Sequence, residues 1–213
     1  MEQILVLGHG GHAISLVDIL EREKLYNVAG YVVNNDEAEE GWSYPIIGRD
    51  EDLEDLYRKG ITNAAIGIGY LGKGNLRETL YHMLKKIGYK VPVICDPSAI
   101  VSEHATIQEG SFIGKGAIIN SGAVIGKGCI INSGAIVEHD CYVNDFSHIS
   151  VGSVLCGEVQ IGSASFIGAN ATIIQGVVIQ RNSIVGAGAV VTENIMEKSI
   201  AAGVPAKIIK SNG

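Results

Sequence analysis

The chain has 213 residues, a formal net charge of −7 and 46% hydrophobic residues, enough for a packed core in one large or two modest domains. It has no run rich in Lys and Arg, which argues against nucleic acid or an anionic membrane as the main partner. No apolar run reaches about 18 residues, so we expect no membrane span. The first residues enter a strand pattern without a basic n-region, so we expect no signal peptide and a cytoplasmic location.

The first 96 residues alternate between strand and helix patterns. Strands are expected over residues 3–7, 28–33, 63–69 and 89–94, a brief extended piece over residues 45–48, and helices over residues 13–25, 50–59 and 75–87. Asp50 is the expected N-cap of the second helix. The alternation predicts a small parallel α/β sheet of Rossmann-like type over residues 1–96.

A glycine-rich loop joins the first strand to the first helix. Its pattern, Gly8-x-Gly10-x-x-Ala13, is typical of loops that hold a diphosphate at a helix N-terminus. A dinucleotide would favour an acidic residue after the second strand, where Asn34 and Asn35 stand, although Asp36 is close. A nucleotide-sugar diphosphate fits equally well, and a tight turn with no ligand is a third interpretation. His9 and His12 are either ligand contacts or polar loop residues.

From residue 101 to residue 191, every sixth residue is aliphatic. This strict period predicts a parallel β-helix, in which each hexapeptide is one short strand and one corner. The residue two positions before each aliphatic residue is small and also points inward. The corner is often Gly or Asn, which tolerate a positive φ. The second domain therefore covers residues 97–213, with a tail from residue 193. The aliphatic positions are Val101, Ile107, Ile113, Ile119, Ile125, Ile131, Val137, Val143, Ile149, Leu155, Ile161, Ile167, Ile173, Ile179, Val185 and Val191.

Two histidines, His139 and His148, lie in the part of the repeat where the corner residues are no longer Gly or Asn. Asp140 replaces the usual corner glycine directly after His139. His148 precedes the inward Ile149, so its side chain is expected to project outward from the face. An exposed imidazole beside a carboxylate suits a general base, and clustered exceptions in a regular repeat favour a functional zone. The alternative is that His139 is only a solvated corner residue.

The whole chain resembles the sialic acid O-acetyltransferase (NeuD-like) family of hexapeptide acyltransferases, and most of all its UDP-4-amino-sugar N-acetyltransferases (PglD-like). The motifs that carry the resemblance are the glycine loop at residues 8–12, Glu-His-Asp-Cys at 138–141, Phe-Ser-His-Ile-Ser-Val-Gly at 146–152 and Gly-Val-Pro-Ala-Lys at 203–207. The resemblance implies an α/β domain followed by an all-β, left-handed parallel β-helix. It also implies a homotrimer with acetyl-CoA in a groove between neighbouring β-helices and a UDP-sugar in the first domain.

Residue roles follow from the same resemblance. His139 is implied as the general base, with Asp140 as its partner, where the family often has Glu. His148 is implied to lie near the acetyl-CoA thioester, the backbone of Gly157 to face the acetyl oxygen, and Ala169 and Ala187 to line the pantetheine groove. The implied nucleotide-sugar contacts are Gly8, His9, Gly10, Gly11, His12, Asn34 and Asn35. Relatives often carry acidic residues at these last two positions.

The expected function is transfer of the acetyl group of acetyl-CoA to the 4-amino group of a UDP-4-amino-4,6-dideoxy sugar, in bacterial glycan or glycoprotein sugar synthesis. One alternative is O-acetylation of sialic acid or another sugar hydroxyl. A zinc enzyme of carbonic-anhydrase type needs three converging imidazoles, and the spacing of His104, His139 and His148 provides no tight pair, so no metal is expected. A further alternative is a non-catalytic protein that binds sugar nucleotides.

Overall fold

A computed structural model of the chain describes residues 1–34 and 43–212, so Asn35 lies outside the described residues. The chain forms two compact units. The first comprises Met1–Gly69 and Leu76–Pro97, and the second comprises Tyr70–Asn75 and Ser98–Gly213. The short segment Tyr70–Asn75 therefore packs with the second unit, although the chain on both sides of it belongs to the first. Among the described residues, no helix combines the length and apolar character needed to cross a bilayer.

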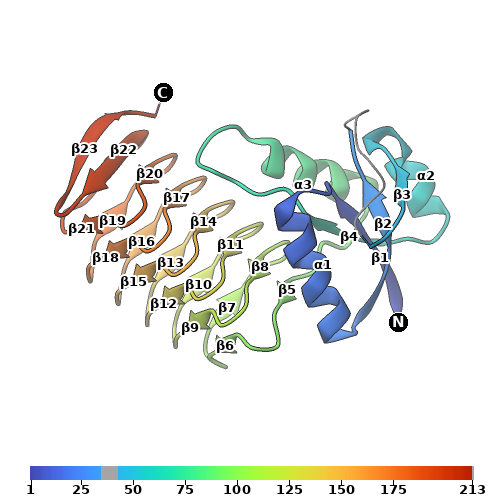
Figure 1. The fold of residues 1–213 in the computed structure, drawn as a ribbon, viewed down its shortest axis with the longest axis horizontal. Coiled ribbons are helices and arrows are strands. Elements are labelled where there is room, and N and C mark those ends of the chain that lie inside the picture. Colours follow the sequence, from blue (N-terminus) through green and yellow to red (C-terminus); the bar gives the residue numbers. More distant parts are fainter. Residues whose placement is uncertain (35–42, 213) are drawn as a thin grey trace. The chain divides into compact units, whose positions relative to one another are not determined.

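The first unit contains a parallel sheet with strand order β3-β2-β1-β4 (Figure 1). Its strands are β1 (Glu2–Leu7), β2 (Tyr26–Val32), β3 (Ile46–Gly48) and β4 (Asn63–Ile66), and its helices are α1 (Gly11–Glu23), the 3₁₀ turn η1 (Asp50–Asp52), α2 (Leu53–Arg58) and α3 (Leu76–Ile87). The central strand β1 is buried along most of its length, with Ile4, Leu5 and Val6 fully buried. Burial on both faces is typical of parallel sheets covered by helices, and it explains the continuous apolar run.

Two local predictions for the first unit are wrong. A fourth strand over residues 89–94 does not form; Lys90 makes a single parallel bridge to Asn63, and a two-residue strand, β5 (Ile94–Cys95), follows. Pro92 lacks an N–H group and so cannot extend a ladder. Asp50 is not the N-cap of the second helix, because it lies within the 3₁₀ turn η1 and α2 begins at Leu53, with Asp52 in the N-cap position.

The second unit is a parallel β-helix built from two-residue strands, as the six-residue period predicts. Each strand pairs with the strand 18 residues further along, as in the register of Val124 with Tyr142. The strands stack into three faces (Figure 1). They are β6 (Ile100–Val101), β7 (Thr106–Ile107), β8 (Phe112–Ile113), β9 (Ile118–Ile119), β10 (Val124–Ile125), β11 (Ile130–Ile131), β12 (Ile136–Val137), β13 (Tyr142–Val143), β14 (His148–Ile149), β15 (Val154–Leu155), β16 (Gln160–Ile161), β17 (Phe166–Ile167), β18 (Thr172–Ile173), β19 (Val178–Ile179), β20 (Ile184–Val185) and β21 (Val190–Val191).

The interior of the β-helix is filled by the second residue of most strands and by the small residue two positions before it. Ile131, Ile149 and Ile167 are fully buried, as are the small residues Ser165 and Ala171. Each 18-residue coil of the β-helix therefore places aliphatic and small side chains in the interior directly above those of the preceding coil. The corners have a positive φ, and glycine occupies many of them because it adopts that conformation without a steric penalty.

The tail beyond residue 193 forms a β-hairpin, which the sequence pattern did not predict. Strand β22 (Ser199–Gly203) pairs in parallel with β20 and antiparallel with β23 (Ala206–Ser211). The hairpin therefore extends one face of the β-helix beyond the last hexapeptide, and it covers the ladder groups that the last strand of that face would otherwise expose.

Candidate functional site

His139 and Asp140 form a paired site at one corner of the β-helix. His139 Nδ1 lies 3.0 Å from Asp140 Oδ2. Asp140 has a φ of +58°, the left-handed conformation that glycine adopts at other corners. An Asp tolerates this conformation better than most residues do, because its short side chain can hydrogen-bond locally. The His139 side chain remains 51% exposed, so its ring is accessible from solvent while one nitrogen is held.

The electrostatic surroundings of His139 favour its cationic form. The hydrogen bond to Asp140 raises the pKa of the imidazole above its usual range, and the negative charges of Asp140, Glu138 and Glu158 add to this effect. Because the carboxylate accepts a hydrogen bond from Nδ1–H, the neutral ring carries its lone pair on Nε2. This arrangement can take up a proton at Nε2 and stabilise the resulting cation.

Gly157 lies directly against the His139 ring. A Cβ atom at this position would stand 2.5 Å from Nε2 and 2.6 Å from Cε1, so any side chain would displace the imidazole. Gly157 is 18 residues after His139, one turn of the β-helix, and the next residue, Glu158, donates its N–H to the His139 carbonyl at 2.9 Å. Glycine therefore gives Nε2 space on the side of the adjacent coil.

His148 does not belong to this group; it lies on a face of the β-helix, in β14, and is buried, unlike the ring of His139. Its side chain is only 6% exposed. Nδ1 lies 2.6 Å from the carbonyl oxygen of Tyr70, Nε2 lies 3.1 Å from Asn132 Nδ2, and the ring packs edge-to-face on Phe166 at a centroid distance of 5.2 Å. The residue does point outward from β14, as the alternation predicts, but the segment Tyr70–Asn75 covers it. A neutral ring that donates from Nδ1 and accepts at Nε2 satisfies both contacts.

Ala169 and Ala187 stack on each other at a different corner. The Ala169 carbonyl accepts the N–H of Gly188 at 2.8 Å, which keeps the two alanines one turn apart. Ala169 is twelve residues, or two hexapeptides, beyond Gly157, so the two cannot share a corner. Within one chain, the residues implied for the pantetheine groove and the His139 pair are therefore separate.

The glycine loop of the first unit contains glycines of two kinds. Gly8 has a φ of +86°, and a Cβ atom on it would stand 2.8 Å from the side chain of Ile68, so the fold itself requires glycine there. Gly10 and Gly11 have no heavy atom within 4 Å of a Cβ position and no positive φ. Because nothing inside the described structure excludes a side chain at these two positions, they leave room for another molecule to approach the backbone.

A pocket of about 240 Å³ lies beside this loop at the carboxyl ends of β1 and β2. Gly8, His9 and Asn34 are among the residues that line it, and His12, in the first turn of α1, is not. Ligands of open parallel sheets bind at this end of the strands. The lining is Leu7, Gly8, His9, Val32, Val33, Asn34, Asp50, Ile68, Leu76 and Leu80.

Asp50 is the residue of this pocket that the sequence patterns missed. Asn34 donates its side-chain N–H to the Asp50 carboxylate, and the Asn34 carbonyl oxygen accepts the backbone N–H of Asp50 at 3.1 Å. The glycine-loop pattern of dinucleotide sites favours an acidic residue directly after the second strand. In this structure the acidic residue at that place is Asp50, which comes 16 residues after Asn34 in the chain. Only the sheet order, which places β3 beside β2, could have revealed it.

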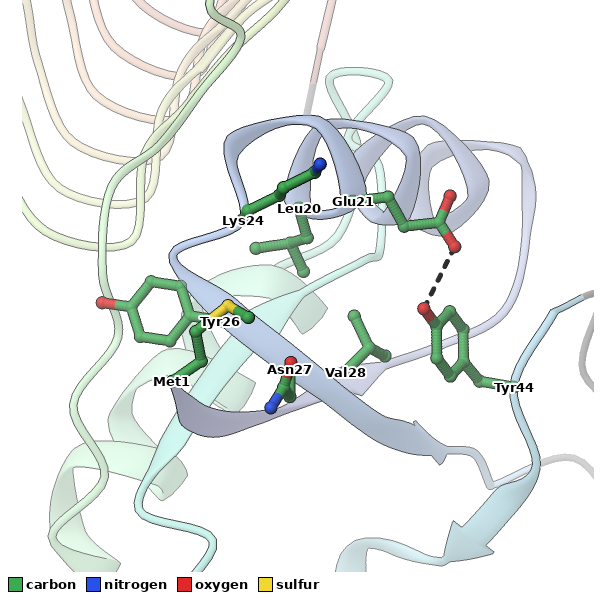
Figure 2. A pocket seen from close by; sticks show the side chains of 8 residues that line it. All are labelled: Met1, Leu20, Glu21, Lys24, Tyr26, Asn27, Val28 and Tyr44. Atoms are coloured by element: carbon green, nitrogen blue, oxygen red, sulfur yellow. Dashed lines mark hydrogen bonds between the residues drawn. The ribbon is translucent and has the colours of Figure 1, made fainter.

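A second pocket of the first unit, about 350 Å³, lies at the opposite, amino end of β1 and β2 (Figure 2). Leu20 and Glu21 of α1 and its C-cap residue Lys24 face Tyr26, Asn27 and Val28 across it, together with Met1 and Tyr44. The Tyr44 hydroxyl donates to Glu21 Oε1 at 3.1 Å. None of the predicted site residues lies here, and the amino ends of parallel strands are not where such sheets hold their ligands.

Comparison with known proteins agrees with this architecture. Residues 3–84 match the PglD N-terminal domain, and residues 104–139 and 158–193 match the bacterial transferase hexapeptide repeats. A variant of the GDP-perosamine N-acetyl transferase from Caulobacter crescentus, in complex with CoA and GDP-perosamine, is 33% identical, with a TM-score of 0.93 over 99% of this chain and 98% of that chain. The chain belongs to the PglD-like sugar N-acetyltransferases. The resemblance proposed from the sequence motifs is thereby confirmed.

Other members and relatives of the family extend the comparison. The acetyltransferase domain of PglB from Neisseria gonorrhoeae, in complex with acetyl coenzyme A, is 30% identical, with a TM-score of 0.88 over 98% of this chain and 99% of that chain. A 2,3,4,5-tetrahydropyridine-2,6-dicarboxylate N-acetyltransferase from Staphylococcus aureus is 42% identical over 71 residues. That match spans 30% of this chain and 30% of the curated relative.

The contact between His139 and Asp140 predicts how the imidazole titrates. Asp140→Asn removes the carboxylate that raises the pKa of His139, so we expect the pKa to fall toward that of an ordinary histidine. An NMR titration of the imidazole measures this shift without reference to activity. Glu138→Gln is the matched control, because Glu138 raises the pKa of the ring only through its charge and by less than Asp140 does. An equal fall in both variants would contradict the role of the hydrogen bond.

Proposed function

We propose that the protein transfers the acetyl group of acetyl-CoA to the amino group of a nucleotide-linked amino sugar. The observation that carries this proposal is the His139–Asp140 pair at an exposed corner, with Gly157 leaving Nε2 accessible. Binding of CoA and of a sugar-nucleotide amine by the Caulobacter crescentus relative supports the choice of both substrates. An amine acceptor is favoured over a sugar hydroxyl because the Caulobacter crescentus relative, which binds a sugar-nucleotide amine, is an N-acetyl transferase.

The proposed reaction uses the Nε2 lone pair of His139. As the sugar nitrogen attacks the thioester carbonyl, a C–N bond forms and His139 accepts a proton from the nitrogen. Collapse of the tetrahedral intermediate breaks the C–S bond, and the proton passes to the departing thiolate, giving CoA and the acetamido sugar. Asp140 orients the ring and stabilises its cation, in the manner of a carboxylate behind a catalytic imidazole. The backbone N–H of Gly157, beside Nε2, is the proposed donor to the oxyanion.

We propose that the pocket beside the glycine loop holds the nucleotide diphosphate, with its base toward Asn34 and Asp50. The Asn34 amide is already bonded to Asp50, so the carboxylate of Asp50 is the group that would accept N–H donors of a base. Uracil and guanine both carry such donors. A UDP-4-amino-4,6-dideoxy sugar remains the substrate proposed from the sequence, and a GDP-linked sugar is the second candidate because the Caulobacter crescentus relative binds one.

We propose a homotrimer as the active form, working in the cytoplasm where acetyl-CoA and nucleotide sugars are available. His139 and Gly157 lie on one corner, whereas His148 and the two alanines lie elsewhere on the β-helix, so contact between two copies would unite them in one groove. The face formed by β6, β9, β12, β15, β18 and β21 also carries an outward aliphatic stripe that breaks only at Thr172. Stripes of this kind are typical of association surfaces. The stripe consists of Ile100, Ile118, Ile136, Val154, Thr172 and Val190.

A thiol-release assay tests the proposed activity. With acetyl-CoA and a panel of UDP- and GDP-linked amino sugars and sialic acid, we expect turnover with an amino sugar. His139→Ala should lower kcat by roughly 10²–10⁴, as for loss of a general base, while the exposed position leaves the free energy of unfolding within about 0.5 kcal/mol. Turnover with sialic acid alone would contradict an amine acceptor. If no acceptor led to consumption of the thioester, the proposed acetyltransferase activity would be contradicted.

The nucleotide site is tested by Gly10→Val. Because the space around Gly10 is open within the protein, the variant should fold normally but block close approach of a diphosphate. The KM for the sugar nucleotide should rise about tenfold or more, with the KM for acetyl-CoA unchanged. Ser15→Val, one turn further along α1, is the control and should change neither KM. A parallel rise in both KM values for Gly10→Val would show that the first unit does not separate the two substrates.

The assembly is tested by sedimentation equilibrium, where we expect three times the 22.5 kDa chain mass. Ile136→Asp places a charge in the aliphatic stripe and should shift the protein toward smaller species. Gln160→Asp, outward on another face, should not. A monomeric wild-type protein at assay concentration would contradict both the trimer and the shared groove.

A further inference from the structure

A six-residue segment, Tyr70–Asn75, is laid against one face of the β-helix; we call it the strap. The Tyr70 carbonyl accepts the hydrogen bond from buried His148 at 2.6 Å, and the Tyr70 hydroxyl donates to the Ala164 carbonyl at 2.7 Å. Gly72 lies so close to β20 that a Cβ atom on it would stand 2.5 Å from the side chain of Ile184. These contacts hold the first half of the strap in place.

One side chain from the C-terminal end of the chain secures the middle of the strap. Asn212 donates to the Gly72 carbonyl at 3.1 Å and to the Asn182 carbonyl at 2.8 Å. Its backbone N–H also donates to the Lys198 carbonyl at 2.7 Å. Asn212 therefore joins the strap to two successive corners of the β-helix, and the space that these groups border is part of the folded structure of the second unit.

This space is an open pocket of about 440 Å³ with two lysines and no carboxylate in its described lining. It is lined by Tyr70, Gly72, Lys73, Gly74, Asn182, Lys198 and Asn212. The carboxylate next to Lys198 in the chain, Glu197, is bound to Arg181 at 2.9 Å. Among the residues that the structure describes, neither lysine ammonium forms an ion pair within 4.0 Å. A local excess of positive charge is notable in a chain with a net charge of −7.

The backbone around Lys73 adds to this character. Gly72 and Gly74 have φ values of +81° and +75°, on either side of a residue whose φ is not positive. When right-handed and left-handed backbone conformations alternate, successive N–H groups point toward the same side. Such N–H groups are typical of anion-binding loops. Ammonium groups on flexible stems bind phosphate as point charges and adapt to its position.

We propose that the strap pocket binds a phosphate group, with Lys73 and Lys198 as its cationic contacts. The first candidate source is coenzyme A, whose phosphates lie at the end of the molecule remote from the thioester; this choice of source rests on the proposed function. The pocket lies along the same face as His148: Asn182 precedes β20 and Lys198 precedes β22, two and three strands along from β14, which is roughly 10 and 14 Å along the axis at the usual strand spacing. The second source is a free phosphate compound that binds independently of the reaction.

Calorimetric titration of the full chain distinguishes these sources. The probes are CoA, adenosine 3′,5′-bisphosphate and inorganic pyrophosphate, against wild type, Lys73→Ala/Lys198→Ala and the charge-matched control Lys86→Ala/Lys210→Ala. We expect the pocket variant to bind CoA and the bisphosphate about tenfold or more weakly, and the control to match wild type. Lys73→Arg/Lys198→Arg should retain binding, and Asn212→Ala should weaken it without a change of charge.

The possible results distinguish phosphate binding at the strap pocket from the proposed acetyl transfer. Weaker CoA binding with unchanged turnover of S-acetyl-pantetheine, which lacks these phosphates, supports the coenzyme as the source. Weaker pyrophosphate binding with CoA affinity unchanged supports the pocket as a site for a separate phosphate compound. Equal affinities of wild type and the pocket variant for all three probes would overturn the proposal, whether or not the protein transfers acetyl groups. Failure of wild type to bind CoA, with pyrophosphate binding sensitive to the two lysines, would count against the proposed function alone.

Discussion

The parallel hydrogen-bond ladder that joins each two-residue strand to the strand 18 residues later is the constraint on which the second unit depends. It requires a sharp turn every six residues and allows only small or aliphatic side chains inside. The same ladder superposes residues that are one turn apart in the chain. His139 and Gly157 become neighbours for this reason, since the N–H of Glu158 is bonded to the His139 carbonyl. The geometry of the site is therefore a direct product of the repeat.

A corner of such a β-helix is well suited to a proton-transfer group. Its backbone is held by ladder bonds above and below, yet its side chains stand in solvent. His139 combines these properties, and the left-handed backbone of Asp140 brings the carboxylate back to Nδ1. The carboxylate raises the pKa of the ring, so the base is stronger but is protonated over a wider range of acidic pH. Activity that depends on the neutral ring is accordingly expected to rise with pH through that raised pKa.

Local periodicity was sufficient to predict the β-helix and the His139 corner, because both depend on contacts between residues a fixed distance apart in sequence. The burial of His148 could not be predicted, since the segment that covers it comes from residues 70–75, between a strand and a helix of the other unit. Asp50 was assigned as a helix cap for the same reason: its contact with Asn34 depends on the placement of β3 beside β2. The C-terminal hairpin was also missed, as its pairing partner, β20, lies in the repeat and not in the tail.

The central claim is that the imidazole held by Asp140 accepts the proton of the attacking amine. Chemical rescue tests it most directly: the rate of acetyl transfer by His139→Ala is measured at saturating substrates with and without added imidazole, then with substituted imidazoles of different pKa. A rate that increases with imidazole concentration, and with the basicity of the neutral rescuing base, is the predicted result. A His139→Ala variant that turns over at the wild-type rate with no added base would contradict the claim.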